Sequence, residues 1–174
     1  ELLLSRPRTS TEYQEAITTI LSEAKRLNSL TQQLLELAKA ESMTNLPDPV
    51  SFGIDTALLE VLEKFPLHRL HLQLKACDGD CLVEGHPFLL HTALSNLVEN
   101  ALKYSGEKPI DIQFKKEQGG YQIVIEDKGI GIPKEDMDKI FQPLFRALNA
   151  RHQKGHGIGL PLAKRIIELH NGSL

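Results

Sequence analysis

The sequence predicts an α+β sandwich, in which one β-sheet carries helices on one face, preceded by a long helical segment. Two observations support this prediction. A heptad spacing of apolar residues runs through the first 45 residues, and beyond them short alternating strands occur in groups separated by helices. Apolar residues make up 41% of the chain, charged residues 25%, and the net charge is −3. This composition argues against a nucleic-acid-binding protein, which would carry a basic stripe, and no apolar run approaches the ~20 residues of a membrane span.

The first segment predicts a helix from about Thr9 to Met43. Thr9 and Glu12 fit a capping box at its start. Its seam steps alternately by four and three residues and comprises Tyr13, Ile17, Ile20, Ala24, Leu27, Thr31, Leu34 and Ala38. Residues 1–4 read as the end of an earlier helix. Residues 1–45 therefore predict a helical hairpin with a truncated first arm, which is either a coiled-coil linker within one chain or half of a dimeric four-helix bundle.

A second domain is expected over residues 46–174, because the stretch from Asn45 to Pro49 contains two prolines and ends the helix. Apolar residues alternate with polar ones over 70–74, 110–114 and 121–125, which predicts strands, and Gly119-Gly120 predicts a hairpin between the last two. Helices are predicted at about 53–64, 87–104, a short stretch after Pro133, and 160–170.

Two cysteines, Cys77 and Cys81, flank the turn-like sequence Asp-Gly-Asp. A disulfide or half of a metal site is conceivable, but no further ligands follow at metal-site spacing. We expect two reduced, structural thiols at a hairpin of a cytosolic protein.

The predicted helix 87–104 carries a polar face opposite its apolar one. Asn96, Asn100 and Lys103 stand at i, i+4 and i+7, so they share that face. A solvated surface would explain the pattern, although asparagine is a poor helix former. The alternative is a ligand site, because an amide oxygen can bind Mg²⁺ and a lysine can meet phosphate.

Two glycine-rich stretches follow predicted strands or precede predicted helices. In the first, Asp127, Gly129 and Gly131 come directly after an apolar strand, which fits either a capped turn or a carboxylate beside a nucleobase. In the second, Gly155, Gly157 and Gly159 run into a helix, which fits either a plain loop or a phosphate site made of backbone N–H groups. No dinucleotide-binding, Walker or protein-kinase motif occurs.

The order of these motifs carries a resemblance to a known family. NLVENALKYS (96–105), DKGIG (127–131), FQPLFR (141–146) and GHGIGL (155–160) resemble the N, G1, F and G2 boxes of sensor histidine kinases, in that order. The resemblance covers about residues 86–172 and implies the Bergerat fold that these kinases share with gyrase-type ATPases. The first 45 residues resemble the end of that family's dimerisation and histidine-phosphotransfer hairpin.

The resemblance implies ATP and Mg²⁺ as ligands and assigns a role to each motif. Asn100 would bind the Mg²⁺ that bridges the phosphates, with Asn96 beside it. Lys103 would contact phosphate, Tyr104 would lie along the adenine or ribose, and Asp127 would accept from the adenine amino group.

The remaining expected contacts come from the loops. Gly129 and Gly131 would shape the adenine pocket, Arg146 would reach the terminal phosphates, and Phe141 would seat the ATP lid. Gly155, Gly157 and Gly159 would form the lid's hinge and phosphate-facing end. His156 would approach the nucleotide, and Leu160 would also belong to the binding site. Together with Asn96, Asn100 and Lys103, Arg146 would form the catalytic set.

The resemblance also implies partners. The parent protein would be a homodimer through the hairpin and would pass the phosphoryl group to a response regulator receiver domain. It would be cytoplasmic here, with any membrane anchor in parts absent from this chain. The acceptor histidine would lie on the upstream helix, since all seven histidines of this chain fall between His68 and His170.

Two alternative functions remain, and two residues depart from the family pattern. A degenerate or anti-sigma-type binding module would bind nucleotide or a protein without transfer. A gyrase-like hydrolase is disfavoured because Asn96 stands where those enzymes carry a glutamate base. His86 replaces the usual aspartate before Pro87, which predicts a weaker helix cap, and Leu144 stands where an aromatic residue is common.

Overall fold

The computed structural model describes residues 9–74, 81–153 and 155–174. The chain forms two compact units that divide after Glu36, and each is described by itself. Two predictions lie outside the described residues. They are the end of an earlier helix at residues 1–4, and the turn expected at Cys77 and the Asp-Gly-Asp sequence.

Helix α1 (Ser10–Ser42) begins at the predicted capping box. Thr9 N donates to Glu12 Oε2 over 2.8 Å, and Glu12 N donates to Thr9 Oγ1 over 3.3 Å. Two orphan N–H groups are thereby satisfied, which confirms the predicted start. The seam residues Ile17 and Leu27 are 64% and 54% exposed, so much of the predicted apolar stripe is not buried within the described part of the chain.

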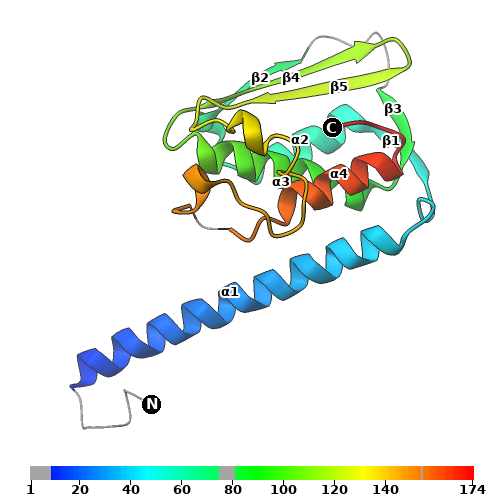
Figure 1. The fold of residues 1–174 in the computed structure, drawn as a ribbon. Coiled ribbons are helices and arrows are strands. Elements are labelled where there is room, and N and C mark those ends of the chain that lie inside the picture. The colour runs from blue at the N-terminus through cyan, green and yellow to red at the C-terminus, as the bar shows by residue number, and fades with distance from the viewer. Residues whose placement is uncertain (1–8, 75–80, 154) are drawn as a thin grey trace. The chain divides into compact units, whose positions relative to one another are not determined.

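The second unit contains a mixed three-stranded sheet in the order β2 (Leu70–Leu74), β4 (Ile110–Glu117), β5 (Gly120–Glu126). The central strand β4 runs parallel to β2 and antiparallel to β5. Helices α2 (Ile54–Leu62), α3 (Pro87–Tyr104) and α4 (Gly159–Leu169) lie on one face of this sheet (Figure 1). This arrangement confirms the predicted fold class.

The core lies between that sheet face and the helices. Ile110, Ile112 and Phe114 of β4 are at most 2% exposed, and Val98 of α3 is fully buried. These residues follow the period of two for the strand and the helical period for α3, so the sequence pattern alone specifies which side chains face inward. The Phe114 and Tyr121 rings stack across β4 and β5 with centroids 5.6 Å apart. The hairpin is therefore also stabilised through a cross-strand pair.

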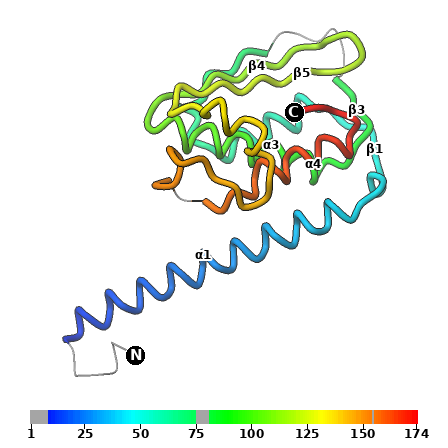
Figure 2. The backbone as a smooth tube through the Cα atoms, viewed as in Figure 1, coloured from blue at the N-terminus to red at the C-terminus, as the bar shows by residue number. Residues whose placement is uncertain are grey.

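Three details differ from the prediction. Strands β1 (Val50–Gly53) and β3 (Leu82–Gly85) form a separate antiparallel pair at one end of the second unit (Figure 2). Each of them has four residues, the shortest run over which a period of two indicates a strand. β2 pairs with β4 in parallel, through a crossover that includes α3, and not through a hairpin. Cys81 is disulfide-bonded, so the expectation of a reduced thiol is wrong for this residue.

The connections contain short 3₁₀ helices: η1 (Leu67–Arg69), η2 (Lys134–Asp136) and η3 (Leu148–Ala150). Within the described ranges, no helix combines the length and apolarity needed to cross a membrane.

Candidate functional site

Helix α3 positions the first group of candidate residues. Pro87 occupies its first turn, and His86 Nδ1 accepts from Leu89 N over 3.4 Å, a long capping bond that agrees with the expected weaker cap. Asn96 Nδ2 donates to Thr92 O over 2.9 Å. The half-buried Asn100 makes no side-chain hydrogen bond to another described residue. Its amide oxygen and amide nitrogen are therefore not engaged by the described part of the chain.

The last turn of α3 meets the glycine-rich loop. Lys103 Nζ donates to Tyr104 Oη over 3.1 Å and lies 4.5 Å from the centre of the Tyr104 ring. A Cβ atom on Gly155 would overlap Lys103 Nζ, and Gly155 has φ of +140°. The ammonium group consequently lies against a loop position that only glycine fills without strain.

The loop after β5 rests on the same end of α3. Asp127 Oδ1 accepts from Gly129 N over 2.8 Å. A Cβ on Gly129 would overlap the carbonyl oxygen of Tyr104. Gly131 has φ of +66°, and its carbonyl oxygen accepts from Asn149 Nδ2 over 3.0 Å. Asp127 itself is exposed.

The glycine-rich loop leads directly into α4. Gly157 has φ of +72°, and its carbonyl oxygen accepts from Leu144 N over 2.9 Å. A Cβ on Gly159, the first residue of α4, would lie 2.6 Å from Asn96 Oδ1. The structure thus brings the N-terminal residue of α4, Gly159, next to Asn96 on the polar face of α3, and Leu160 follows it in the helix. His156 in the same loop is half-buried.

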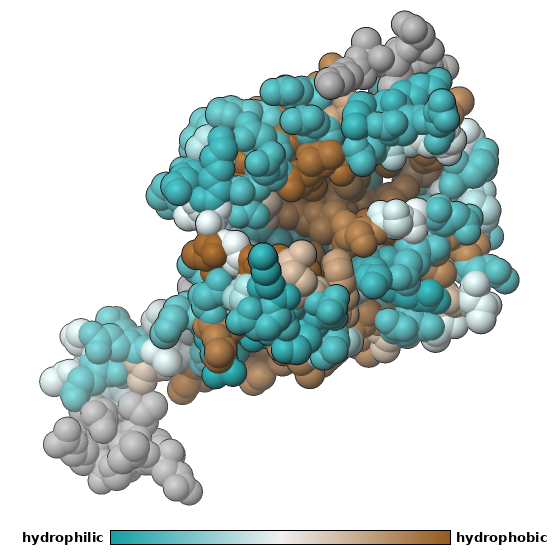
Figure 3. Space-filling view, turned by 45° about the horizontal axis from the view of Figure 1, so that its top comes forward, coloured by the Kyte–Doolittle hydropathy of each residue, from teal (hydrophilic) through white to brown (hydrophobic). Residues whose placement is uncertain are grey.

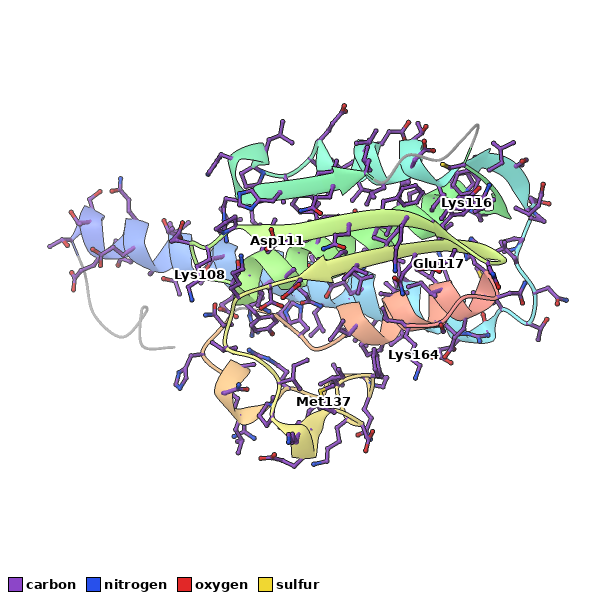
Figure 4. All side chains as sticks on the ribbon, turned by 90° about the horizontal axis from the view of Figure 1, so that it is seen from above. Lys108, Asp111, Lys116, Glu117, Met137 and Lys164 are labelled. Atoms are coloured by element: carbon purple, nitrogen blue, oxygen red, sulfur yellow. The ribbon has the colours of Figure 1, made fainter. Side chains whose placement is uncertain are left out.

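Arg146 and Phe141 lie in the connection between these loops. Arg146 Nη2 donates to Ala150 O over 2.6 Å and also to the carbonyl oxygen of Gln153. Its guanidinium is thereby held within its own segment, and any contact with phosphate would require these bonds to be exchanged. Phe141 packs under Lys164 of α4, whose Nζ lies 4.6 Å from the ring centre; Figure 4 labels Lys164 on that helix.

Apolar side chains also occur around the candidate residues. Ile130, Ile132 and Leu144 are 48%, 46% and 58% exposed. Figure 3 shows apolar side chains gathered in a hollow on one face of the larger unit, with polar residues at its margins. A separate pocket, lined in part by Glu84, Arg165 and His170, contains none of the candidate residues. The candidate site is therefore the junction of α3, the β5 loop and the glycine-rich loop.

Residues that the sequence did not single out complete this junction. Asn149 holds Gly131, Lys108 Nζ donates to Lys128 O over 3.1 Å, and Arg69 binds the end of α3. Each acts on a main-chain carbonyl of a segment remote in sequence. Any side chain that is long enough and carries a donor could bind such a carbonyl. No local sequence motif could therefore have indicated these three residues.

Comparisons with known proteins agree with this geometry. Residues 85–174 match the family of histidine kinase-, DNA gyrase B- and HSP90-like ATPases. The chain is 33% identical over 99% of its length to the probable sensor kinase SilS of Salmonella typhimurium, and 31% identical over 89% of its length to the sensor-like histidine kinase SenX3 of Mycolicibacterium smegmatis. It spans 36% and 42% of these two relatives.

A solved structure extends the likeness to the fold. The catalytic domain of the histidine kinase ThkA, in a nucleotide-free form, superposes with a TM-score of 0.58 at 28% identity. The superposition covers 70% of this chain and 80% of that one. The likeness therefore includes most of the second unit described above.

Proposed function

The chain belongs to the histidine kinase-, DNA gyrase B- and HSP90-like ATPase family, as the ATP-binding catalytic portion of a sensor histidine kinase, and we propose that it binds ATP with Mg²⁺ at the junction described above. One observation carries the proposal. Three glycines from two loops each lie against a different residue of α3: Gly129 against Tyr104, Gly155 against Lys103, and Gly159 against Asn96.

The residues at the junction fit a nucleotide and its metal ion. At Gly155 and at Gly159, the start of α4, the absence of a Cβ atom lets the backbone lie close to Lys103 and Asn96. Backbone N–H groups at a helix N-terminus, next to a lysine ammonium group, are the chemistry that recognises phosphate. The Asn100 amide oxygen, which has no hydrogen-bond partner among the described residues, would bind Mg²⁺, and Asn96 would support it. The bound ion would neutralise phosphate charge.

The base would lie at the other end of the junction. Asp127 offers a carboxylate oxygen that is not used by Gly129 N, and it would accept from the adenine amino group. Tyr104 would lie along the adenine or ribose, and Gly129 and Gly131 would leave room for the ring. Leu160, Phe141 and His156 would border the phosphate side, where Arg146 would reach the terminal phosphates after releasing its loop carbonyls.

We further propose that this site supplies the γ-phosphoryl group to a histidine of the parent protein, for relay to an aspartate of a response regulator receiver domain. In the parent, the α1 seam would form a homodimeric bundle, and the catalytic portion would be cytoplasmic. Phosphoryl transfer depends mainly on positioning and charge neutralisation. Asn96 cannot act as a base towards water, because its side chain is an amide; transfer is therefore favoured over hydrolysis.

Incubation with γ-labelled ATP tests the proposal. The chain alone should acquire no acid-labile label, since none of its histidines lies in α1. An added fragment of the parent protein that carries the acceptor histidine should become labelled, and Asn100→Ala should abolish this transfer. ATP binding without any transfer to that fragment would favour the degenerate binding module, and absence of nucleotide binding would refute both.

A further inference from the structure

Arg69, the last residue of η1, binds the C-terminal end of α3 from a distance in sequence. Its Nη2 atom donates to Leu102 O and to Ser105 Oγ, both over 3.0 Å, and to the carbonyl oxygens of Gly106 and Lys108. The last carbonyls of a helix have no partner within the helix, and they carry partial negative charge. A guanidinium at this place satisfies the carbonyls and complements that charge.

The turn that follows α3 is built around this contact. Ser105 is only 4% exposed, and its hydroxyl lies 3.1 Å from Leu102 O and 3.0 Å from Lys108 O. One buried hydroxyl and one guanidinium therefore hold the last turn of α3 and the residues up to Lys108 in a single geometry. A buried polar group that loses its partner is costly, so this geometry is strongly specified.

The same turn holds the loop after β5. Lys108 Nζ donates to Lys128 O over 3.1 Å, and Lys128 Nζ pairs with Asp111 Oδ2 over 2.9 Å. The hydrogen bond from Lys128 is the largest influence that lowers the pKa of Asp111. Figure 4 shows Lys108 and Asp111 at the same end of the β4–β5 hairpin. Lys128 lies between Asp127 and Gly129, so both bonds act directly on the loop that carries them.

We propose that Arg69 is a positioning residue for the base-binding side of the nucleotide site. Through the turn 105–108 it sets the distance between Tyr104 and the loop 127–131, where Gly129 is in contact with the Tyr104 carbonyl. Arg69 itself contacts none of the residues expected to touch nucleotide. The inference rests on the proposed function, because positioning has an effect only if the junction binds a nucleotide.

Arg69→Lys tests the inference, since lysine keeps the charge but its shorter side chain does not carry a nitrogen as far as Nη2, the atom from which all four bonds are made. Amides of residues 104–108 and 127–131 should exchange faster with solvent in the nucleotide-free protein. The affinities for ADP and for adenosine should both fall by roughly tenfold, as expected when a site loses its fixed geometry. The equal factor for the two ligands would locate the loss at the adenosine part, which they share, and not at the phosphates.

Arg165→Lys is the matched control. Arg165 also donates to main-chain carbonyls in the same unit, those of Ala40 and Met43, but these lie outside the junction. Its replacement should lower the midpoint of urea unfolding while leaving ADP affinity unchanged at a temperature where both variants are folded. An equal loss of affinity in both variants would show a general effect of stability and overturn the inference, as would unchanged affinity in Arg69→Lys.

Two further outcomes also decide the inference: no nucleotide binding by the wild-type chain, and an Arg69→Lys variant that does not fold. If the wild-type chain binds no nucleotide, the proposed function fails, and unchanged exchange at 127–131 in Arg69→Lys would overturn the structural link as well. If Arg69→Lys does not fold, Lys108→Met replaces it, because this change removes the bond to Lys128 O and leaves the Arg69 contacts in place. It should speed exchange at 127–131 and lower affinity for both ligands equally; normal exchange and affinity would contradict the inference.

Discussion

The carbonyl oxygen of Tyr104 lies directly against Gly129, so that a Cβ atom on Gly129 would overlap it and would also lie 2.6 Å from Asp127 Oδ1. Tyr104 ends α3, and Gly129 follows β5. This contact joins the two segments that are expected to enclose the base. It requires a residue without a side chain at position 129, although the backbone there is not in the left-handed region.

Gly129→Ala should therefore destabilise the fold and weaken nucleotide binding together. The added methyl group must displace backbone on one side, and overpacking of this kind costs about 1–3 kcal/mol. Urea unfolding and calorimetry with ADP measure the two effects. Gly120→Ala is the control, because among the described residues no atom beyond its two chain neighbours lies within 4 Å of the place its Cβ would take, and it should change neither. A neutral Gly129→Ala would show that α3 and the β5 loop separate readily.

Asp127→Ala should lower the affinity for ATP and ADP by about 1–3 kcal/mol, because the adenine amino group, enclosed when the nucleotide binds, would lose its acceptor. Asp127→Asn separates two roles of the side chain. Its amide oxygen can still accept from Gly129 N, which keeps the loop bond that Asp127 Oδ1 makes now, while the acceptor for the adenine amine is replaced by a donor. Both variants should therefore bind more weakly in calorimetry, and unchanged affinity in Asp127→Ala would remove the adenine assignment.

Acidification should destabilise the second unit through His170. Its Nδ1–H faces Ile166 O at 2.7 Å, and Nε2 accepts from His86 N over 3.0 Å, so both nitrogens are used by the neutral ring. Burial is the largest influence, and it lowers the pKa of His170 below its ordinary value of 6.5. The unfolded chain then binds the proton more readily than the folded one, so this contribution is complete above pH 6.5 and is lost as the pH falls through the folded-state pKa.

Urea unfolding at pH 8 and at pH 5.5 measures this loss. His170→Gln should flatten the dependence on pH, since the glutamine side chain does not titrate. An identical slope in wild type and His170→Gln would assign the effect to other groups.

Association through the α1 seam should be weak. Ile17, Ile20 and Leu27 are 64%, 59% and 54% exposed, which favours burial against a partner. Two copies of this chain, however, supply two such helices, whereas a four-helix bundle buries the seams of four. Sedimentation should show monomers at nanomolar concentration, and Ile20→Lys should abolish association at higher concentration. A tight dimer at nanomolar concentration would contradict this.

Sequence patterns predict a structural element correctly where its conformation depends only on residues within that element. The Thr9–Glu12 capping box, the extent of α3 and the inward face of β4 depend on neighbours within a few residues. The patterns fail for β1 and β3, which are stable only because they pair with each other across α2 and η1. Parallel pairing of β2 with β4 likewise depends on contacts between segments remote in sequence.

For the candidate site, the residue types and their order in the chain are local properties, so Asn96, Asn100, Lys103, Asp127 and the loop glycines could all be proposed from the sequence. Their mutual placement could not. Three contacts depend on how separate elements pack: Gly129 with Tyr104, Gly159 with Asn96, and Arg69 with the end of α3. Local propensity acts over a few residues, whereas these contacts arise when burial of the shared core brings remote segments within hydrogen-bonding distance.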